Sequence, residues 1–334
     1  MPKIHSIVSA ITLVGSISVA SAWEALPTTA PAPANNPTTA EKVELGRMLY
    51  HDPRLSSTGT VSCASCHNTM LGGEDNRPNS MGVHGQTGGR SAPTVWNSAF
   101  NKVQFWDGRA ASLEEQAAGP VTNPIEMGMK NWDDVVVRLK SIAGYQAYFD
   151  KAFGENSISK DNATKAIAAY ERTLITPNSA YDKYAKGDKT ALTAQQIRGL
   201  KTMAKLGCTT CHSGPAFNGD GSFQKFPVIN NAYLEKKYQF ANDKGLFEVT
   251  AKSGDEHFFK VPTLRNIALT APYFHNGSVK TLEKAVKVMA KVQLGKKLSN
   301  EETADIVAFL NALTGEFPKQ TMPTLPATNG TSFN

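Results

Sequence analysis

Two short motifs in this chain combine a pair of cysteines with an adjacent histidine. They are Cys63-Ala64-Ser65-Cys66-His67 and Cys208-Thr209-Thr210-Cys211-His212. In the pattern C-x-x-C-H the two thiols bond the vinyl groups of a c-type haem, and the adjacent histidine ligates the iron. The chain has four cysteines, so these motifs use all of them. The spacing predicts two covalently bound c-type haems, with His67 and His212 as proximal iron ligands.

Two other uses of these residues fit the sequence less well. A structural zinc site needs a second Cys or His pair, and no such pair follows either motif closely. A thioredoxin-like redox pair needs a surrounding βαβ pattern, which neither motif has. Covalent haem is the interpretation that accounts for every cysteine.

The N-terminal residues have the features of a secretory signal peptide. Lys3 supplies a positive charge, residues 7–19 are apolar, and Ala20-Ser21-Ala22 offers a cleavage site. The apolar stretch is shorter than a transmembrane helix requires, and an uncleaved membrane anchor is the alternative. We predict a signal peptide over residues 1–22 with cleavage after Ala22, no stable membrane insertion, and export to the periplasm, where bacteria attach c-type haem.

Length and charge indicate which kinds of binding partner the chain can have. The chain has 334 residues and a formal net charge of +6. Its lysines and arginines form no dense run with interleaved aromatic residues, so we expect no nucleic-acid partner. Mild basicity indicates at most weak steering toward an acidic donor protein. Residues 23–37, which are rich in Pro, Ala, Thr and Asn, are predicted to be a flexible lead-in.

Each haem motif follows a predicted helix, as in small cytochrome c domains. Thr38-x-x-Glu41 and Thr193-x-x-Gln196 are typical of capping boxes and open helices that lead to Cys63 and Cys208. Ser299-x-x-Glu302 opens a terminal helix in the same way. Further helices are predicted over residues 112–118, 132–142, 161–175 and 281–291.

The expected fold is mainly α, because no long alternation of apolar and polar residues predicts a sheet. We expect two cytochrome c-like helical domains, each carrying one covalent c-type haem. Turn-forming and charged residues between Pro177 and Thr190 indicate the boundary. The domains are predicted over residues 38–180 and 181–320, followed by a tail over residues 321–334.

Residue spacing alone leaves three functional classes open. Two covalent haems could serve electron transfer alone, chemistry on peroxide or oxygen, or oxidative modification of another protein. The sixth ligand of each iron separates these classes. An open or labile position permits chemistry, whereas two firm ligands favour electron transfer.

Six segments of the chain resemble the bacterial di-haem cytochrome c peroxidases. They are Leu45–Ser56, Val61–His67, Phe105–Arg109, Gly119–Met127, Pro272–Gly277 and Leu282–Leu313. The similarity runs in matching order from residue 39 to residue 316. It implies reduction of hydrogen peroxide to water with electrons from a small periplasmic donor, such as a cytochrome c or a copper protein. It also implies a low-potential N-terminal haem for the chemistry, a high-potential C-terminal haem that supplies electrons, and commonly a homodimer.

The resemblance also implies the sixth ligands. His84 matches the family's releasable distal histidine, and it lies in a loop, residues 71–90, that holds six glycines. Glycine lowers the barrier to moving a backbone segment, although the sequence alone also fits a solvated loop histidine. Met289 matches the sixth ligand of the C-terminal haem, where related maturation enzymes that oxidise tryptophan in a partner carry a tyrosine. An ordinary core methionine on an apolar helix stripe is the alternative.

Further residues match those of the family's peroxide pocket. Glu126 matches the catalytic acid/base that relays a proton between the peroxide oxygens, and Gln116 matches its hydrogen-bonding companion. Trp106 aligns with the tryptophan placed between the haems, where it assists electron passage. Without the resemblance, Glu126 fits a surface carboxylate, Gln116 a polar helix residue and Trp106 a core residue.

Two more assignments from the resemblance concern contacts beside the haems. His275 matches a histidine near the C-terminal haem, where we expect a contact to a propionate or to another group beside the haem. The family binds calcium between its domains through an asparagine side chain and two backbone carbonyls. The carbonyls match Thr270 and Pro272, but the asparagine position is Ser91 here. The resemblance thus implies at most one calcium ion, with Thr270, Pro272 and Ser91 as its candidate ligands. A hydroxyl is a poorer calcium ligand than an amide carbonyl, so Ser91 departs from the family's calcium site.

Overall fold

The computed structural model describes residues 24–328 of the chain. The predicted signal peptide over residues 1–22, with its cleavage after Ala22, lies outside these described residues. Each helix between residues 24 and 328 is too short or too polar to cross a lipid bilayer.

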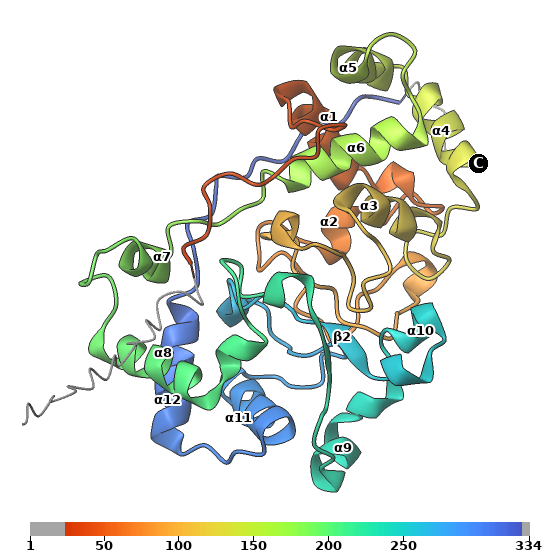
Figure 1. Cartoon of the computed structure of the whole chain (residues 1–334). Helices are drawn as coiled ribbons and strands as arrows, with labels where there is room; N and C mark the ends of the chain where they lie inside the picture. The colour runs from red at the N-terminus through yellow and green to blue at the C-terminus, as the bar shows by residue number, and fades with distance from the viewer. Residues whose placement is uncertain (1–23, 329–334) are drawn as a thin grey trace, which may run out of the picture.

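The described chain is mainly α-helical, as predicted (Figure 1). The helices are α1 (Ala40–His51), α2 (Cys63–Cys66), α3 (Leu113–Thr122), α4 (Trp132–Ser141), α5 (Gly144–Phe153), α6 (Lys160–Glu171), α7 (Ala180–Ala185), α8 (Ala194–Leu206), α9 (Ala232–Tyr238), α10 (Phe247–Thr250), α11 (Leu282–Leu294) and α12 (Asn300–Asn311). Two short strands, β1 (Phe223–Lys225) and β2 (Phe258–Lys260), pair antiparallel with Gln224 opposite Phe259. Short 3-10 turns and irregular segments connect these elements.

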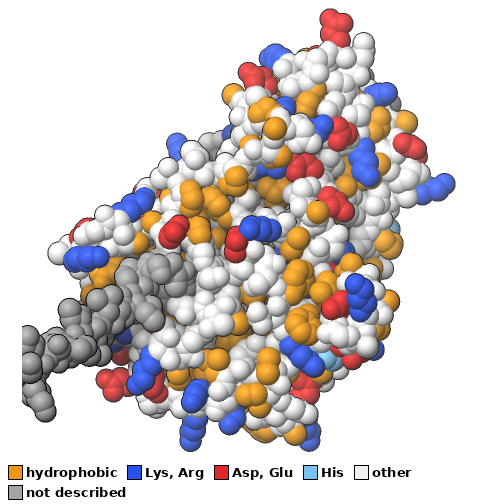
Figure 2. All heavy atoms as spheres, in the orientation of Figure 1, with side chains coloured by type: hydrophobic (Ala, Val, Ile, Leu, Met, Phe, Trp, Pro, Cys, Tyr) orange, Lys and Arg blue, Asp and Glu red, His pale blue; other side chains and the backbone are white. Residues whose placement is uncertain are grey.

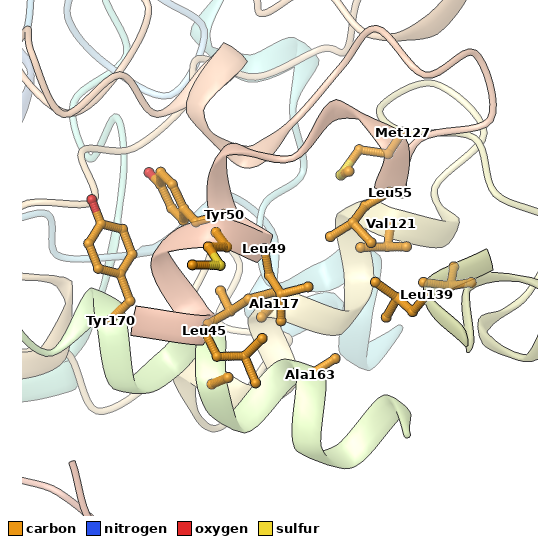
Figure 3. Packing of buried hydrophobic residues seen from close by; sticks show 14 of the residues in the cluster. Leu45, Leu49, Tyr50, Leu55, Ala117, Val121, Met127, Leu139, Ala163 and Tyr170 are labelled. Atoms are coloured by element: carbon orange, nitrogen blue, oxygen red, sulfur yellow. The ribbon is translucent and has the colours of Figure 1, made fainter. Parts of the chain in front are cut away.

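Two separate clusters of buried hydrophobic side chains form the interior. The first draws its residues from Leu45 to Leu174, and the second from Tyr181 to Leu313. Figure 3 shows part of the first cluster, in which side chains of α1, α3 and α6 pack together. Cys63 packs against the first cluster and Cys208 against the second. The two interiors thus draw on separate stretches of the chain, and the domain bounds over residues 38–180 and 181–320 stay a prediction.

In each domain a glycine allows two helices to cross closely. A Cβ atom added to Gly46 of α1 would lie 1.9 Å from the backbone oxygen of Ala166 in α6. The same 1.9 Å would separate a Cβ atom on Gly199 of α8 from the backbone oxygen of Asp305 in α12. Any larger residue would force these helices apart. The two crossings therefore fix the helix that leads into each C-x-x-C-H motif.

The helix starts show which capping predictions hold. The capping boxes Thr193–Gln196 and Ser299–Glu302 are present in the structure. The first helix begins one residue later than predicted, because the hydroxyl of Thr39 rather than Thr38 accepts the backbone N–H of Lys42. The sequence patterns do not predict α5, α7 or α9. The start of α5 has no side-chain cap, and α7 and α9 have only six and seven residues.

Residues 24–37 contain no helix or strand, yet they contact both domains. Leu26 is buried, and its backbone N–H donates a hydrogen bond of 2.8 Å to Asp182 Oδ1. The side-chain amide of Asn36 donates to the Glu114 carboxylate over 2.7 Å. Composition predicts a flexible lead-in here, whereas the structure holds this segment in place through a buried side chain and specific polar contacts.

The C-terminal segment returns from α12 to the first domain (Figure 1). Phe317 packs edge-on against Trp96, with 4.8 Å between the ring centroids. Further along, the carbonyl of Pro326 accepts a hydrogen bond of 2.8 Å from the Arg54 guanidinium. Residues 317–326 therefore contribute contacts to the first domain.

Gly199→Ala is expected to destabilise the protein, because the new methyl group would collide with the backbone of α12. Overpacking of this kind costs about 1–3 kcal/mol. Gly119→Ala is the matched control: its Cβ would lie 3.6 Å from the Phe105 ring, an ordinary contact. Alanine there would gain up to about 1 kcal/mol of helix propensity. Chemical denaturation measures the free energy of unfolding, and an undiminished value for Gly199→Ala would contradict this role of the crossing.

Candidate haem sites

Both motifs fold into a helical turn. The backbone N–H of His67 donates to the Cys63 carbonyl, and that of His212 donates to the Cys208 carbonyl, each over 2.9 Å. Residues three and four positions apart lie on one face of such a turn, so each histidine lies on the side of its first cysteine. Gly207, in the left-handed conformation with φ +87°, ends α8 directly before the second motif.

The two motif histidines are held in the same tautomer. His67 Nδ1 lies 2.9 Å from the Pro93 carbonyl oxygen, and His212 Nδ1 lies 3.1 Å from the Phe217 carbonyl oxygen. A carbonyl can only accept, so Nδ1 carries the hydrogen and the lone pair is on Nε2. Burial lowers the pKa of both rings, which favours the neutral form. Histidines that ligate metals are oriented by this kind of bond.

A large cavity surrounds the second motif. It encloses about 1750 Å³, including its open mouth. Its wall includes Cys208, Cys211 and His212 and, from α11, Met289. The structure therefore brings together the residues that the sequence assigns to the C-terminal haem. The same cavity is also lined by Ser91, Trp106, Thr270, Pro272 and His275.

The surroundings of the cysteines fit thioether attachment to a haem better than a zinc site. Burial raises the pKa of Cys63 to about 12 and that of Cys208 to about 11, because both thiols lie in apolar surroundings. A structural zinc ion takes thiolates and four protein ligands. Among residues 24–328 no group of three or more His, Cys, Asp or Glu side chains could hold a metal ion.

A buried histidine with an unpartnered polar atom lies in the wall of the same cavity. The His275 ring stacks on Phe259 with 4.3 Å between the centroids, and only 2% of the residue is exposed. Its Nε2 atom has no hydrogen-bond partner among the described residues. Burial lowers the pKa of His275 to about 4, so the ring is neutral. An orphaned polar atom here fits a bound group that has polar substituents of its own, as a haem does.

Ser91 connects several predicted residues where the two domains meet. Its carbonyl accepts a hydrogen bond of 2.9 Å from Trp106 Nε1, and its backbone N–H donates to the His275 carbonyl over 2.7 Å. Thr270 and Pro272 line the same cavity. The predicted calcium donors are thus one hydroxyl and two backbone carbonyls, which carry no negative charge. Backbone carbonyls are ordinary calcium ligands, but the Ser91 hydroxyl is a poorer ligand than the asparagine amide it replaces, so these residues fit calcium less well than the family's set does.

At the first motif, the backbone links the predicted distal histidine to the predicted acid. Residues 81–87 form a tight turn closed by an antiparallel bridge, and His84 is exposed at its tip with φ +57°. At the base of the turn, the N–H of the buried Val83 donates over 2.9 Å to the Glu126 carbonyl. The structure therefore brings the His84 turn and the Glu126 segment together.

The Glu126 side chain is half-buried and lies near the first pair of thiols. Burial raises its pKa, and the positive charge of Arg109 partly opposes this shift. The pKa values of Cys63 and Cys66 are raised mainly by burial, and the charge of Glu126 also contributes. A carboxyl in these surroundings can hold and release a proton beside the motif.

Gln116 lies on α3, half-buried, one helical turn before Pro120. After α3 the chain turns and closes back on the helix, since the N–H of Met127 donates to the Pro120 carbonyl over 3.2 Å. This return places the segment that carries Glu126 next to the helix that carries Gln116.

The six glycines of residues 71–90 divide into two groups. The packed group comprises Gly72, Gly73 and Gly82. The open group, in which an added Cβ would meet nothing within 4 Å, comprises Gly85, Gly88 and Gly89. Gly82 shows the contrast most clearly, because its Cβ would lie 2.0 Å from the Ile125 carbonyl oxygen. Freedom of movement is thus expected over residues 85–89, whereas the base of the loop needs glycine for close packing.

Two arginines not assigned from the sequence take part in the site. The Arg109 guanidinium lies 3.5 Å from the centroid of the Phe105 ring and donates to Asp107 over 2.9 Å. Arg90, at the end of the His84 loop, pairs with Asp107 and, across the domain contact, with Asp243. The motif Phe105–Arg109 is a sequence signal for Arg109, but no local pattern relates Arg90 to Asp243.

Known proteins resemble this chain over most of its length. Residues 40–190 match the family model described as di-haem cytochrome c peroxidase. The cytochrome c551 peroxidase of Nitrosomonas europaea is 45% identical over 301 residues, which cover 90% of this chain and 87% of that protein. The cytochrome c peroxidase Ccp of Escherichia coli is 48% identical over 291 residues, or 86% of this chain. This chain spans 61% of the length of the Escherichia coli protein.

A solved structure agrees with these similarities. A MauG-like protein associated with microbial copper homeostasis has a TM-score of 0.78 and 32% identity to this chain. The likeness covers 87% of this chain and 95% of that one. Two haem-attachment motifs, each beside its own core, agree with the family's two c-type haems. By its fold, its motifs and its similarity to these relatives, the chain belongs to the di-haem cytochrome c peroxidase family.

Proposed function

We propose that this chain reduces hydrogen peroxide to water with electrons taken from a small redox protein. The observation that carries the proposal is the contrast between the two motifs. The first lies beside a half-buried acid, Glu126, whereas the second lies in a largely apolar cavity with Met289. The peroxidase names of the relatives from Nitrosomonas europaea and Escherichia coli support the same reaction.

Two c-type haems would supply the iron that binds peroxide and the centre that stores electrons. Their thioether bonds would come from Cys63 and Cys66 at the first motif and from Cys208 and Cys211 at the second. The Nε2 atoms of His67 and His212 would be the proximal ligands, with His84 and Met289 as the sixth ligands. The tautomers described above favour these histidine roles.

At the first site, Glu126 would move the proton that cleavage of peroxide requires. Its carboxyl, with a pKa raised by burial, can accept a proton from one peroxide oxygen and donate it to the other. The charge of Arg109 opposes the shift and favours the ionised form, which can act as a base. The Gln116 amide, which can both donate and accept, would hold peroxide in position.

The second site would receive electrons and pass them toward the first. A thioether ligand such as Met289 raises the potential of a haem, which suits an electron-accepting centre. Trp106 lines the cavity of the second site and is hydrogen-bonded to Ser91, in the segment that follows the His84 loop. It would therefore lie between the two centres.

His84 would be a ligand that leaves to open the first site. Its turn is anchored at Val83 by the bond to Glu126 and at Arg90 by ion pairs, while the open glycines lie between these anchors. Release of His84 would thus require movement of a short segment only.

The wider setting is also proposed from the sequence. A signal peptide over residues 1–22 would direct the chain to the periplasm, where a cytochrome c or a copper protein would be the donor. A homodimer is the expected assembly. We do not extend the proposal to calcium, since Ser91 offers a hydroxyl where the family's site has an amide carbonyl.

Stopped-flow mixing tests the proposed reaction directly. With reduced cytochrome c or a reduced copper protein as donor, we expect oxidation of the donor that depends on peroxide, two donor molecules per peroxide because each gives one electron. A pure electron carrier would oxidise no donor in response to peroxide. Such a result, with both haems present by mass spectrometry, would refute the peroxidase function.

Glu126→Gln is expected to lower peroxidase turnover by about 10²–10⁴-fold, because the amide cannot relay a proton. Both haem adducts should remain by mass spectrometry. Glu155→Gln, at an exposed position of the same domain, is the matched control and should leave turnover unchanged. Unchanged turnover in Glu126→Gln would remove this residue from the mechanism.

The same variant gives a check through pH. Burial raises the Glu126 pKa, so the carboxyl becomes protonated as pH falls through that raised value and can no longer act as a base. Turnover of the parent should therefore decline on the acid side. The residual activity of Glu126→Gln should lack this decline. If turnover of the variant fell in the same way at low pH, the titrating group would be a residue other than Glu126.

His84→Ala is expected to make the N-terminal haem high-spin in the fully oxidised protein, because its sixth ligand is removed. The variant should then react with peroxide without prior reduction. The parent should show a high-spin N-terminal haem only after half-reduction. Electronic absorption and electron paramagnetic resonance spectra report the spin state of the haem in the oxidised and the half-reduced protein. A low-spin N-terminal haem in oxidised His84→Ala would show that His84 is not the ligand.

A further inference from the structure

A cleft rimmed by lysines lies on the outer side of α11, the helix that carries Met289. We propose that this surface, the lysine cleft, docks the acidic face of the small redox protein that donates electrons. Its rim is formed by Lys284, Lys287, Lys291, Lys296 and Lys297. Its apolar lining comes from Leu234, Val288 and Leu298. The inference names the partner surface for the proposed peroxidase and therefore rests on that function.

One helix separates the lysine cleft from the cavity of the second haem motif. Ala285 and Met289 line the cavity, whereas Lys284 and Lys291 line the cleft, so the two sets lie on different faces of α11. Leu298 lines both. An α-helix with its side chains is about 10–12 Å across. A redox centre docked at the cleft would thus be held close to the cavity.

The charge of the cleft is not neutralised within the described chain. Over residues 24–328 none of its five lysines forms an ion pair, and Lys287 donates to the Asn300 side chain instead. Lysines elsewhere on the surface do pair with carboxylates, as Lys183 does with Glu316 and Lys244 with Glu256. The cleft therefore keeps its charge for an external partner.

Few acidic groups face the cleft from the elements around it. The segment 280–302 has six lysines and three glutamates. Of these acids, Glu302 is engaged in the capping box of α12. On α9, Glu235 accepts the backbone N–H of Ala241. The surface is therefore positive, and it would attract a negatively charged protein and repel a basic one.

Exposed apolar side chains border the cleft. Ile229, 38% exposed, is joined to α11 by its N–H, which donates over 2.8 Å to the Val292 carbonyl. Val228 precedes it at 56% exposure, and Tyr233, next to Leu234 on α9, is 71% exposed. Figure 2 shows Lys or Arg side chains among apolar ones along the lower edge of the molecule, where Figure 1 places α9 and α11. Apolar contact with a charged rim suits a partner that binds briefly and must leave after one electron.

Charge reversal tests the lysine cleft. The triple variant Lys284→Glu/Lys291→Glu/Lys297→Glu changes three exposed rim residues. With a reduced acidic cytochrome c as donor, its kcat/KM should fall about tenfold or more at low ionic strength and recover toward the parent value when salt is raised in both. The corresponding triple Lys→Arg variant keeps the charge and should retain the parent kcat/KM.

A second triple variant, Lys140→Glu/Lys151→Glu/Lys160→Glu, makes the same charge change on exposed residues of the first domain. It should have little effect, and a loss equal to that of the cleft variant would overturn the proposal in favour of a net-charge effect. An unchanged kcat/KM in the cleft variant would also overturn it. So would unchanged donor kinetics together with loss of binding to phosphatidylserine vesicles, which would identify a membrane-binding surface.

Hydroquinone, a small neutral donor, separates this proposal from the proposed function. Turnover with hydroquinone should be equal in the parent and the cleft variant, because a small donor needs no docking surface. Absence of hydroquinone turnover in the parent would count against the peroxidase function itself. In that case calorimetric binding of the acidic cytochrome c to parent and cleft variant still decides the docking proposal: equal affinities would refute it.

Discussion

Close crossing of helices at two glycines determines where both haem motifs lie. Gly46 lets α1 meet α6 at backbone distance, and Gly199 does the same for α8 and α12. Each crossing fixes the helix that delivers the chain to a C-x-x-C-H motif. The motifs then fold alike, with the same turn and the same bond from the histidine Nδ1 to a backbone carbonyl. The two sites therefore share one local geometry, and their differences come from the residues that other segments bring to them.

Some of those segments belong to one domain and line the cavity around the haem motif of the other. The loop that begins in the first domain places Ser91 in the wall of the second cavity, where it joins Trp106 and His275. One residue earlier, Arg90 pairs with Asp243 of the second domain. The surroundings of one motif thus include groups anchored in the other domain. Rearrangement of the His84 loop would therefore disturb the second cavity, because the contacts of Arg90 and Ser91 lie only a few residues after His84.

Local patterns in the sequence were enough for the motifs, the mainly helical fold and two of the capping boxes. Thr38 was a wrong cap because two adjacent threonines satisfy the same pattern, and only the backbone path selects Thr39. The burial of Leu26 and the pairing of Arg90 with Asp243 depend on residues more than 150 positions away, which no local pattern reports. Likewise, glycine content indicated a mobile loop, but only packing separates Gly82, which needs its small size, from Gly88, which faces open space. Only the resemblance to the family suggests the roles proposed for Glu126 and Met289, since a carboxylate in a turn and a methionine on an apolar stripe are common features.

The path of the last residues has a consequence for how the molecule is made. Phe317 and Pro326 cover parts of the first domain, so that domain lacks part of its covering until residues 317–326 have been synthesised. An N-terminal half emerging alone would expose the Trp96 ring to water and leave the Arg54 guanidinium short of an acceptor. The two lobes have separate interiors, yet the first is completed only when the stretch from Phe317 to Pro326 wraps back over the part of the chain that was made first.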